Sequence, residues 1–135
     1  MAATQRDIEV FNDSLERTSG SPFLERFYEL FVASSPEVAE KFAHTDFRQQ
    51  RHAVKVSLYM MMSAALGHPE GDVHLTRIAR RHSRAELAIG PELYDLWLDC
   101  LIRAVREHDR SFSGETERAW RNVLQRGIEL MKSRY

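Results

Sequence analysis

The sequence predicts an all-α protein, and three features of the chain support this class. Apolar residues recur at the spacings i, i+3, i+4 and i+7 that place them on one face of an α-helix. No segment shows the sustained alternation of apolar and polar residues that is typical of a strand. Clusters of proline, glycine and serine divide the chain into segments of helical length. We therefore predict seven or eight helices.

Each predicted helix has a start or stop signal in the sequence. The start signals are capping side chains and first-turn prolines, namely Thr4 or Asp7, Pro22, Pro36, Thr45 or Asp46, and Pro91. The predicted helices cover about 5–18, 22–34, 36–42, 47–66, 73–82, 91–108 and 115–133. Such unequal lengths do not suit an up-and-down four-helix bundle, and they favour a fold that encloses a ligand.

Composition narrows the class of protein. The 135 residues suit one domain, 1–135, and the net charge of −1 argues against a nucleic-acid or acidic-membrane partner. No run reaches the roughly 20 apolar residues of a membrane span, and the first ten residues do not resemble a secretion signal. With a single cysteine, Cys100, the chain suits a reducing compartment, so we expect a cytoplasmic protein.

His82 is the most informative candidate residue. Leu75, Ile78, Ala79 and His82 share one face of a helix, and arginines occupy the opposite face. A charged imidazole on an apolar face is costly, so His82 is either hydrogen-bonded in the core or bound to a metal. Neutral imidazole is the commonest metal ligand in proteins.

Three other predicted helices carry polar side chains that can face His82. The long helix has a stripe that begins with Gln50 and continues through Val54, Ser57 or Leu58, Met61 and Ala65. The second helix has Tyr28, and the helix after Pro91 has Tyr94 and Trp97 on one face. If these faces meet, they form an apolar pocket with one strong ligand and three hydrogen-bond donors, Tyr28, Gln50 and Trp97.

The order and spacing of these segments resemble the bacterial globins, specifically the haem domain of flavohaemoglobins and the related single-domain and sensor globins. Val54 and His82 are 28 residues apart, and the resemblance covers nearly the whole chain. The stretches that carry it are Arg26–Phe31 followed by Ser35–Glu37, Phe42, Gln50–Val54, Ile78–His82, Pro91–Tyr94, and Ala119 with Trp120. The resemblance implies a globin fold around a haem pocket.

The resemblance also implies roles for individual residues. His82 is the expected ligand of haem b iron, Phe42 packs against the porphyrin, and Tyr28 and Gln50 face the bound gas, with Trp97 assisting. The remaining residues expected at the cofactor are Val54, Leu58, Ile78, Arg81, Tyr94 and Trp97, with Arg81 pairing with a haem propionate. His44 and His52 are weaker candidates for the iron, since His52 falls on another side of its helix and His44 lies in a loop.

The chain departs from the flavohaemoglobin pattern in two ways that affect function. It contains no reductase domain, and no glutamate of the final helix matches the one that flavohaemoglobins direct at the proximal histidine. We therefore expect a backbone carbonyl one turn earlier, such as that of Ile78, to accept the second imidazole N–H.

Taken together, these features predict a globin that binds O2, CO and NO reversibly and releases O2 slowly. Alternatives are an NO dioxygenase that depends on a separate reductase, a gas-sensing module, and a globin-shaped interaction domain without haem. A homodimer through Leu93–Leu101 and Trp120–Met131 is a further expectation, because Leu98, Ile102 and Val123 add apolar residues there.

Overall fold

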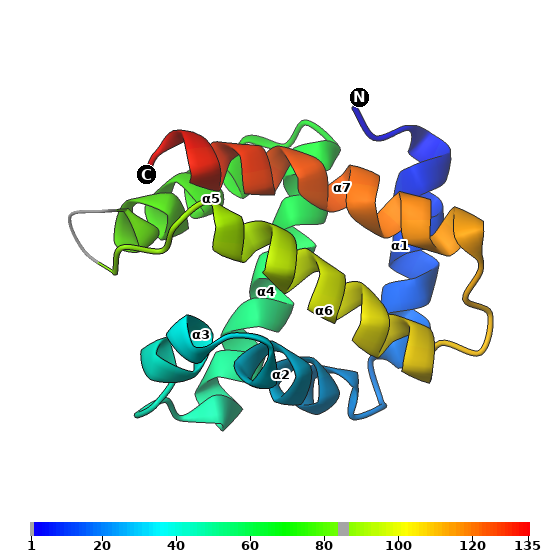
Figure 1. Cartoon of the computed structure of the whole chain (residues 1–135). Helices are drawn as coiled ribbons and strands as arrows, with labels where there is room; N and C mark the ends of the chain where they lie inside the picture. Colours follow the sequence, from blue (N-terminus) through cyan, green and yellow to red (C-terminus); the bar gives the residue numbers. More distant parts are fainter. Residues whose placement is uncertain (1, 84–86) are drawn as a thin grey trace.

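A computed structural model describes residues 2–83 and 87–135 of the chain. The described residues form seven α-helices and no strand, which confirms the predicted all-α class (Figure 1). The helices are α1 (Gln5–Thr18), α2 (Phe23–Ser34), α3 (Pro36–Lys41), α4 (Phe47–Ala65), α5 (Pro69–His82), α6 (Glu92–His108) and α7 (Gly114–Ser133).

The helices pack in pairs around a shared apolar core. α1 packs against α7, α2 against α6, and α4 and α5 pack against each other and against α7. In Figure 1, α4 passes behind α6, while α2 and α3 lie at the lower end of the molecule. Among the described residues, no helix combines the length and the apolar character that crossing a bilayer requires.

Local signals set most of the helix boundaries. Thr4 caps α1, with its hydroxyl accepting from the Asp7 backbone N–H while the Asp7 carboxylate accepts from that of Thr4. The Asp46 carboxylate caps α4, so of the two candidates Asp46 is the one that acts. Pro22 precedes the first helical residue rather than occupying it.

α5 begins earlier than the sequence predicts. We expected a break through Asp72, but Pro69 already occupies the first helical position, and Glu70 and Asp72 lie in the positively polarised first turn. Residue 71 lies inside the helix and is a glycine, because α5 crosses the backbone of α4 closely at that point. A Cβ atom at Gly71 would lie 2.6 Å from the Met60 carbonyl oxygen and 2.8 Å from Ala64 Cα.

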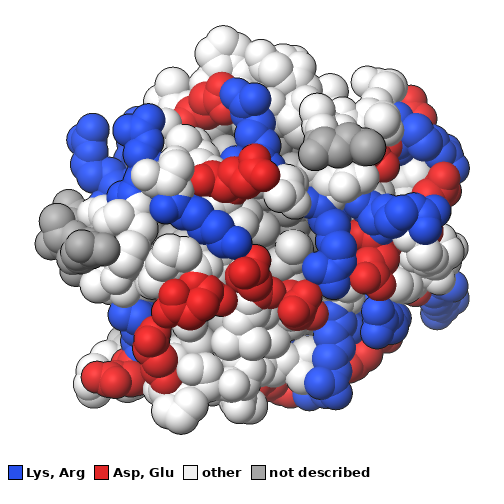
Figure 2. Space-filling model, turned by 45° about the horizontal axis from the view of Figure 1, so that its top comes forward, with Lys and Arg blue, Asp and Glu red and all other residues white. Residues whose placement is uncertain are grey.

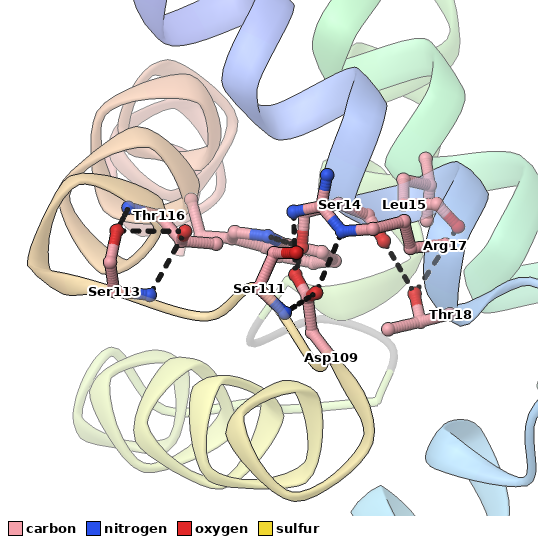
Figure 3. A network of polar contacts seen from close by, with 9 residues as sticks. Ser14, Leu15, Arg17, Thr18, Asp109, Ser111, Ser113 and Thr116 are labelled. Carbon is pink, nitrogen blue, oxygen red and sulfur yellow. Dashed lines mark hydrogen bonds and ion pairs between the residues drawn. The ribbon is translucent and has the colours of Figure 1, made fainter.

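A buried polar network joins the first helix to the segment between the last two (Figure 3). The Asp109 carboxylate, only 4% exposed, accepts hydrogen bonds from Ser14 at 2.6 Å and from Arg17 at 2.7 and 2.9 Å. The indole N–H of Trp120 donates to the Ser14 hydroxyl at 2.9 Å. The network therefore fixes α1 against α6 and α7 at the end of the bundle away from α3.

Candidate functional site

His82 is the last residue of α5, and it lies half-buried at the core edge. Its Nδ1 atom is 3.0 Å from the hydroxyl oxygen of Tyr94, on α6. Burial lowers the pKa of His82, and the positive charge of Arg81 lowers it further. The imidazole is therefore neutral near pH 7, and its Nε2 atom has no hydrogen-bond partner among the residues that the structure describes.

The hydrogen bond of the His82 side chain differs from the one that we expected. The sequence suggested a backbone acceptor such as the Ile78 carbonyl, but the partner in the structure is the Tyr94 side chain. Burial raises the pKa of Tyr94 to about 12, so its hydroxyl stays protonated. A ligand on Nε2 requires the imidazole proton to be on Nδ1, from which it donates to the Tyr94 oxygen. The bond therefore restrains the rotation of the ring. It is also compatible with the tautomer that leaves Nε2 free for a ligand, because the Tyr94 hydroxyl can accept a hydrogen bond as well as donate one.

A second polar group, Tyr28 of α2, lies inside an aromatic cluster. Its ring is 5% exposed and packs against Phe27, Phe42 and Phe47 with centroid distances of 4.6, 5.6 and 5.4 Å. Burial raises the pKa of Tyr28 to about 12, and an interaction with the Gln50 side chain acts in the opposite direction. Tyr28 is therefore a protonated phenol that lies close to the side chains of Gln50 and Phe42.

Trp97 belongs to the same wall of the core. It lies half-buried on α6, one turn beyond Tyr94, and its ring packs edge-on against Phe27 with a centroid distance of 6.0 Å. Phe27 in turn contacts Tyr28. Trp97 and Tyr28 thus both contact the ring of Phe27.

The remaining predicted cofactor residues divide by burial. Val54 and Leu58 of α4 are buried, at 7% and 0% exposure, whereas Phe42 and Ile78 are half-buried against the core. Leu58 rather than Ser57 continues the apolar stripe, because the Ser57 hydroxyl lies 3.2 Å from His74 Nε2. Half-buried apolar side chains such as these suit contact with a flat apolar group.

The loop that follows His82 has contacts that were not predicted from the sequence. The Lys41 ammonium at the end of α3 donates to the carbonyls of Leu87 and Ala88, both at 3.2 Å. The Ile89 N–H returns to the His82 carbonyl at 2.9 Å. Lys41 therefore connects the element that carries Phe42 to the loop that begins at His82.

The charged and alternative candidates lie at the surface. Arg81 is exposed and forms no ion pair among the described residues. His44 and His52 are also exposed, and the expectation that His52 points away from the core is consistent with this. In the described part of the chain, no group of three or more His, Cys, Asp or Glu side chains is placed to hold a bare metal ion.

The three apolar residues on which the predicted homodimer depended are not exposed. Leu98, Ile102 and Val123 are only 8%, 2% and 0% exposed within a single chain. They are core residues, because α6 and α7 each pack against several other helices and bury more than one narrow stripe.

Comparison with known proteins decides the family. The globin family model matches residues 25–129, which include every candidate site residue from Tyr28 to Trp97. The chain belongs to the globin family. Membership implies haem as the cofactor and diatomic gases as the ligands, and the donor set around His82 fits such a group. No curated protein matches the chain significantly.

A solved structure agrees closely with this globin. It is the crystal structure of a Pseudomonas aeruginosa protein described as structurally highly homologous to a human haemoglobin. The two chains are 42% identical, with a TM-score of 0.91, and the match covers 96% of this chain and 98% of the other. The likeness therefore extends to α1, outside the family-model match.

Proposed function

We propose that this globin holds haem b through Nε2 of His82 and binds O2 reversibly, as well as CO and NO. The observation that carries the proposal is the pairing of His82 with Tyr94, because it fixes one imidazole nitrogen and leaves the other accessible. When bound, haem supplies the iron at which a diatomic gas is held. The chain's own side chains then set the affinity and the rates.

On the proximal side, the neutral Tyr94 hydroxyl orients the imidazole without giving it negative charge. A carboxylate in that position would make His82 a stronger electron donor, as in haem sites that break O–O bonds. With a pKa of about 12, Tyr94 does not ionise at neutral pH. The proximal side therefore favours holding a ligand over activating it.

The walls of the site come from three helices and the end of α3. Phe42, Val54, Leu58, Ile78 and Trp97 would pack against the macrocycle, and the exposed Arg81 would pair with a propionate. Bidentate arginine–carboxylate pairing would place that propionate at the solvent edge of the site.

On the distal side, Tyr28 is the principal donor to the gas, with Gln50 and Trp97 assisting. Bound O2 carries partial negative charge, so a hydrogen bond from a protonated phenol stabilises it more than it stabilises CO. Such a bond contributes about 1.5–3 kcal/mol. That energy corresponds to an O2 release that is about 10- to 100-fold slower. The globin is therefore suited to retaining O2 rather than to rapid transport.

The test is a visible absorption spectrum of the protein reconstituted with haem, reduced, and exposed to O2 and then CO. We expect a Soret band that shifts with each gas, and its loss or strong alteration in His82→Ala. His52→Ala is the matched control, because His52 is an exposed histidine on α4. An unchanged spectrum in His82→Ala, or no stoichiometric haem uptake by the wild type, would overturn the proposal.

A second candidate function is NO dioxygenation, in which O2 and NO combine to form nitrate. The buried Tyr28 with Gln50 favours it, because a donor pair restrains the orientation of the gas. After each turnover the iron would have to be re-reduced by an electron donor. The yield of nitrate per haem tests this second candidate function. We expect one equivalent of nitrate without an added electron donor and many equivalents with it. Less than one equivalent in a single turnover would exclude this activity.

A further inference from the structure

The outer face of α5 carries three arginines that no carboxylate in the described part of the chain neutralises. Arg77, Arg80 and Arg81 are all exposed, and none forms an ion pair with a described residue. Elsewhere the charges are interleaved, as Figure 2 shows for the face it presents, and arginines such as Arg121 and Arg126 pair with carboxylates. Because Arg81 would pair with a haem propionate in the proposed function, we call Arg77 and Arg80 alone the arginine face.

The charge of the arginine face acts on its surroundings. The positive charge of Arg77 lowers the pKa of His74 on the same helix, after the larger effect of burial. A field that reaches the half-buried side of α5 also reaches outward, where it attracts an anionic partner.

The arginine face borders an open hollow of about 360 Å³. Asp72, Val73, Thr76, Arg77 and Arg80 line it, and Val73 is 58% exposed. The one carboxylate in the lining, Asp72, is already paired with Arg126 at 2.9 Å. The hollow therefore presents two guanidinium groups, which form no ion pair with any residue that the structure describes, around an exposed valine and a threonine hydroxyl.

The shape of the hollow favours a protein over a small molecule. Sites for small molecules are enclosed and cover most of the ligand surface, whereas this hollow is open to solvent. Nucleic acid is also disfavoured, because the chain has a net charge of −1 and its remaining cations are mostly interleaved with carboxylates. An acidic protein surface with an apolar centre matches both the charge and the exposed Val73.

We propose that the arginine face is the docking surface for an acidic electron-donor protein. This rests on the proposed function, because a haem globin whose iron becomes oxidised needs an outside donor. α5 separates this surface from the pocket side of His82 by about one helix diameter, roughly 10 Å. One electron would pass from the donor to ferric iron and make it ferrous, and no atom or proton needs to cross the contact.

The experiment measures binding of flavodoxin, a small acidic electron-transfer protein, to the wild-type globin with and without haem. The test variant is Arg77→Glu/Arg80→Glu, which leaves Arg81 and His82 intact. The matched control is Arg110→Glu/Arg118→Glu, because those two arginines are also exposed and unpaired among the described residues but lie away from α5. Both double variants change the net charge equally.

We expect the test variant to bind flavodoxin at least about tenfold more weakly than the control at low ionic strength. Added salt should bring the wild type down to the level of the test variant, because exposed charges are screened within about 3 Å at 1 M. The rate at which reduced flavodoxin reduces the ferric haem should fall in parallel, whereas reduction by an uncharged small molecule should not.

Equal binding by the two double variants would overturn the docking surface, as would failure of the wild type to bind flavodoxin at low salt. Tighter binding of a DNA oligonucleotide than of flavodoxin would assign the arginine face to nucleic acid instead. The haem spectrum of each variant tests the proposed function separately. A normal haem spectrum with equal flavodoxin binding by the two double variants refutes only the docking surface. A missing haem spectrum refutes the proposed function and, with it, the electron-transfer role of the arginine face.

Discussion

Gly71→Ala tests how rigidly α4 and α5 are held where they cross. An alanine Cβ would lie 2.6 Å from the Met60 carbonyl oxygen, 2.8 Å from Ala64 Cα and closer still to Ala64 N. All three atoms belong to the α4 backbone, so no side chain can rotate away. Carbon contacts are optimal at about 3.5–4.0 Å, so the two helices would have to separate by roughly 0.7–1 Å.

The expected cost follows from two opposing effects. Overpacking of this kind typically destabilises a protein by about 1–3 kcal/mol. Alanine recovers up to about 1 kcal/mol through its higher helix propensity. We expect a net loss of about 1–2 kcal/mol, which corresponds to a fall in Tm of roughly 3–8 °C for a chain of this size.

Two other glycines supply controls for this measurement. A Cβ at Gly20 would meet nothing within 4 Å, and one at Gly127 would lie 3.1 Å from the flexible side chain of Met61. Thermal unfolding should therefore rank the alanine variants at positions 20, 127 and 71 in order of falling Tm. If Gly71→Ala proves as stable as Gly127→Ala, the helix crossing yields freely and the reasoning is refuted.

The displacement of α5 caused by the added Cβ should also affect the candidate site. His82 lies on the same helix, 11 residues beyond Gly71 and about 16 Å along its axis. We expect weaker haem retention in Gly71→Ala than in Gly127→Ala, measured as the rate of haem transfer to an acceptor globin. Equal rates would mean that His82 keeps its position when the far end of α5 moves.

Three further predictions address single contacts. Tyr94→Phe removes the partner of His82 Nδ1, worth about 0.5–1.5 kcal/mol, so the iron–histidine stretching band in resonance Raman spectra should shift and broaden; an identical band would show that Tyr94 does not orient the ring. Tyr28→Phe should speed O2 dissociation about 10-fold or more while changing CO dissociation little, by flash photolysis; equal changes for both gases would contradict a hydrogen-bonding role. For Asp109, burial acts to raise the pKa, but hydrogen bonds from Arg17 and Ser14 outweigh it, so the pKa lies below its ordinary value. A carboxyl whose pKa is lower in the folded chain than in the unfolded chain stabilises the fold at pH values above its unfolded pKa. Asp109→Asn should therefore cost about 1–3 kcal/mol of stability at pH 7. The gap to wild type should close as the pH falls below about 4 in urea titrations, and a gap independent of pH would refute the role of its charge.

The sequence predicted the order and type of the helices because their signals are local. Caps such as Thr4 and Asp46, and prolines such as Pro36, act within one turn and need no tertiary context. Gly71 shows where this stops, since in sequence it resembled part of a break. Only the crossing with α4 explains a glycine inside the helix.

The sequence predicted which faces of the helices point inward, but not all the contacts that the candidate residues make. Helical spacing placed Tyr28, Gln50 and His82 on inward faces, and the resemblance supplied their roles. The bond from His82 to Tyr94 spans a loop, and the contacts of Lys41 join α3 to that loop. Periodicity carries no information about such pairs, because it reports which face a residue occupies and not what it meets.

The polar network around Asp109 has a consequence for how the chain folds during synthesis. The hydrogen-bond partners of Ser14 and Arg17 are synthesised only 92–106 residues later, and α1 packs mainly against α7. At about 5–20 residues per second, that interval lasts roughly 5–20 s. Throughout it, the apolar face of α1, with Phe11 and Leu15 at its centre, lacks its α7 partner. Until α7 emerges from the ribosome, the nascent chain therefore exposes an apolar surface that it later buries.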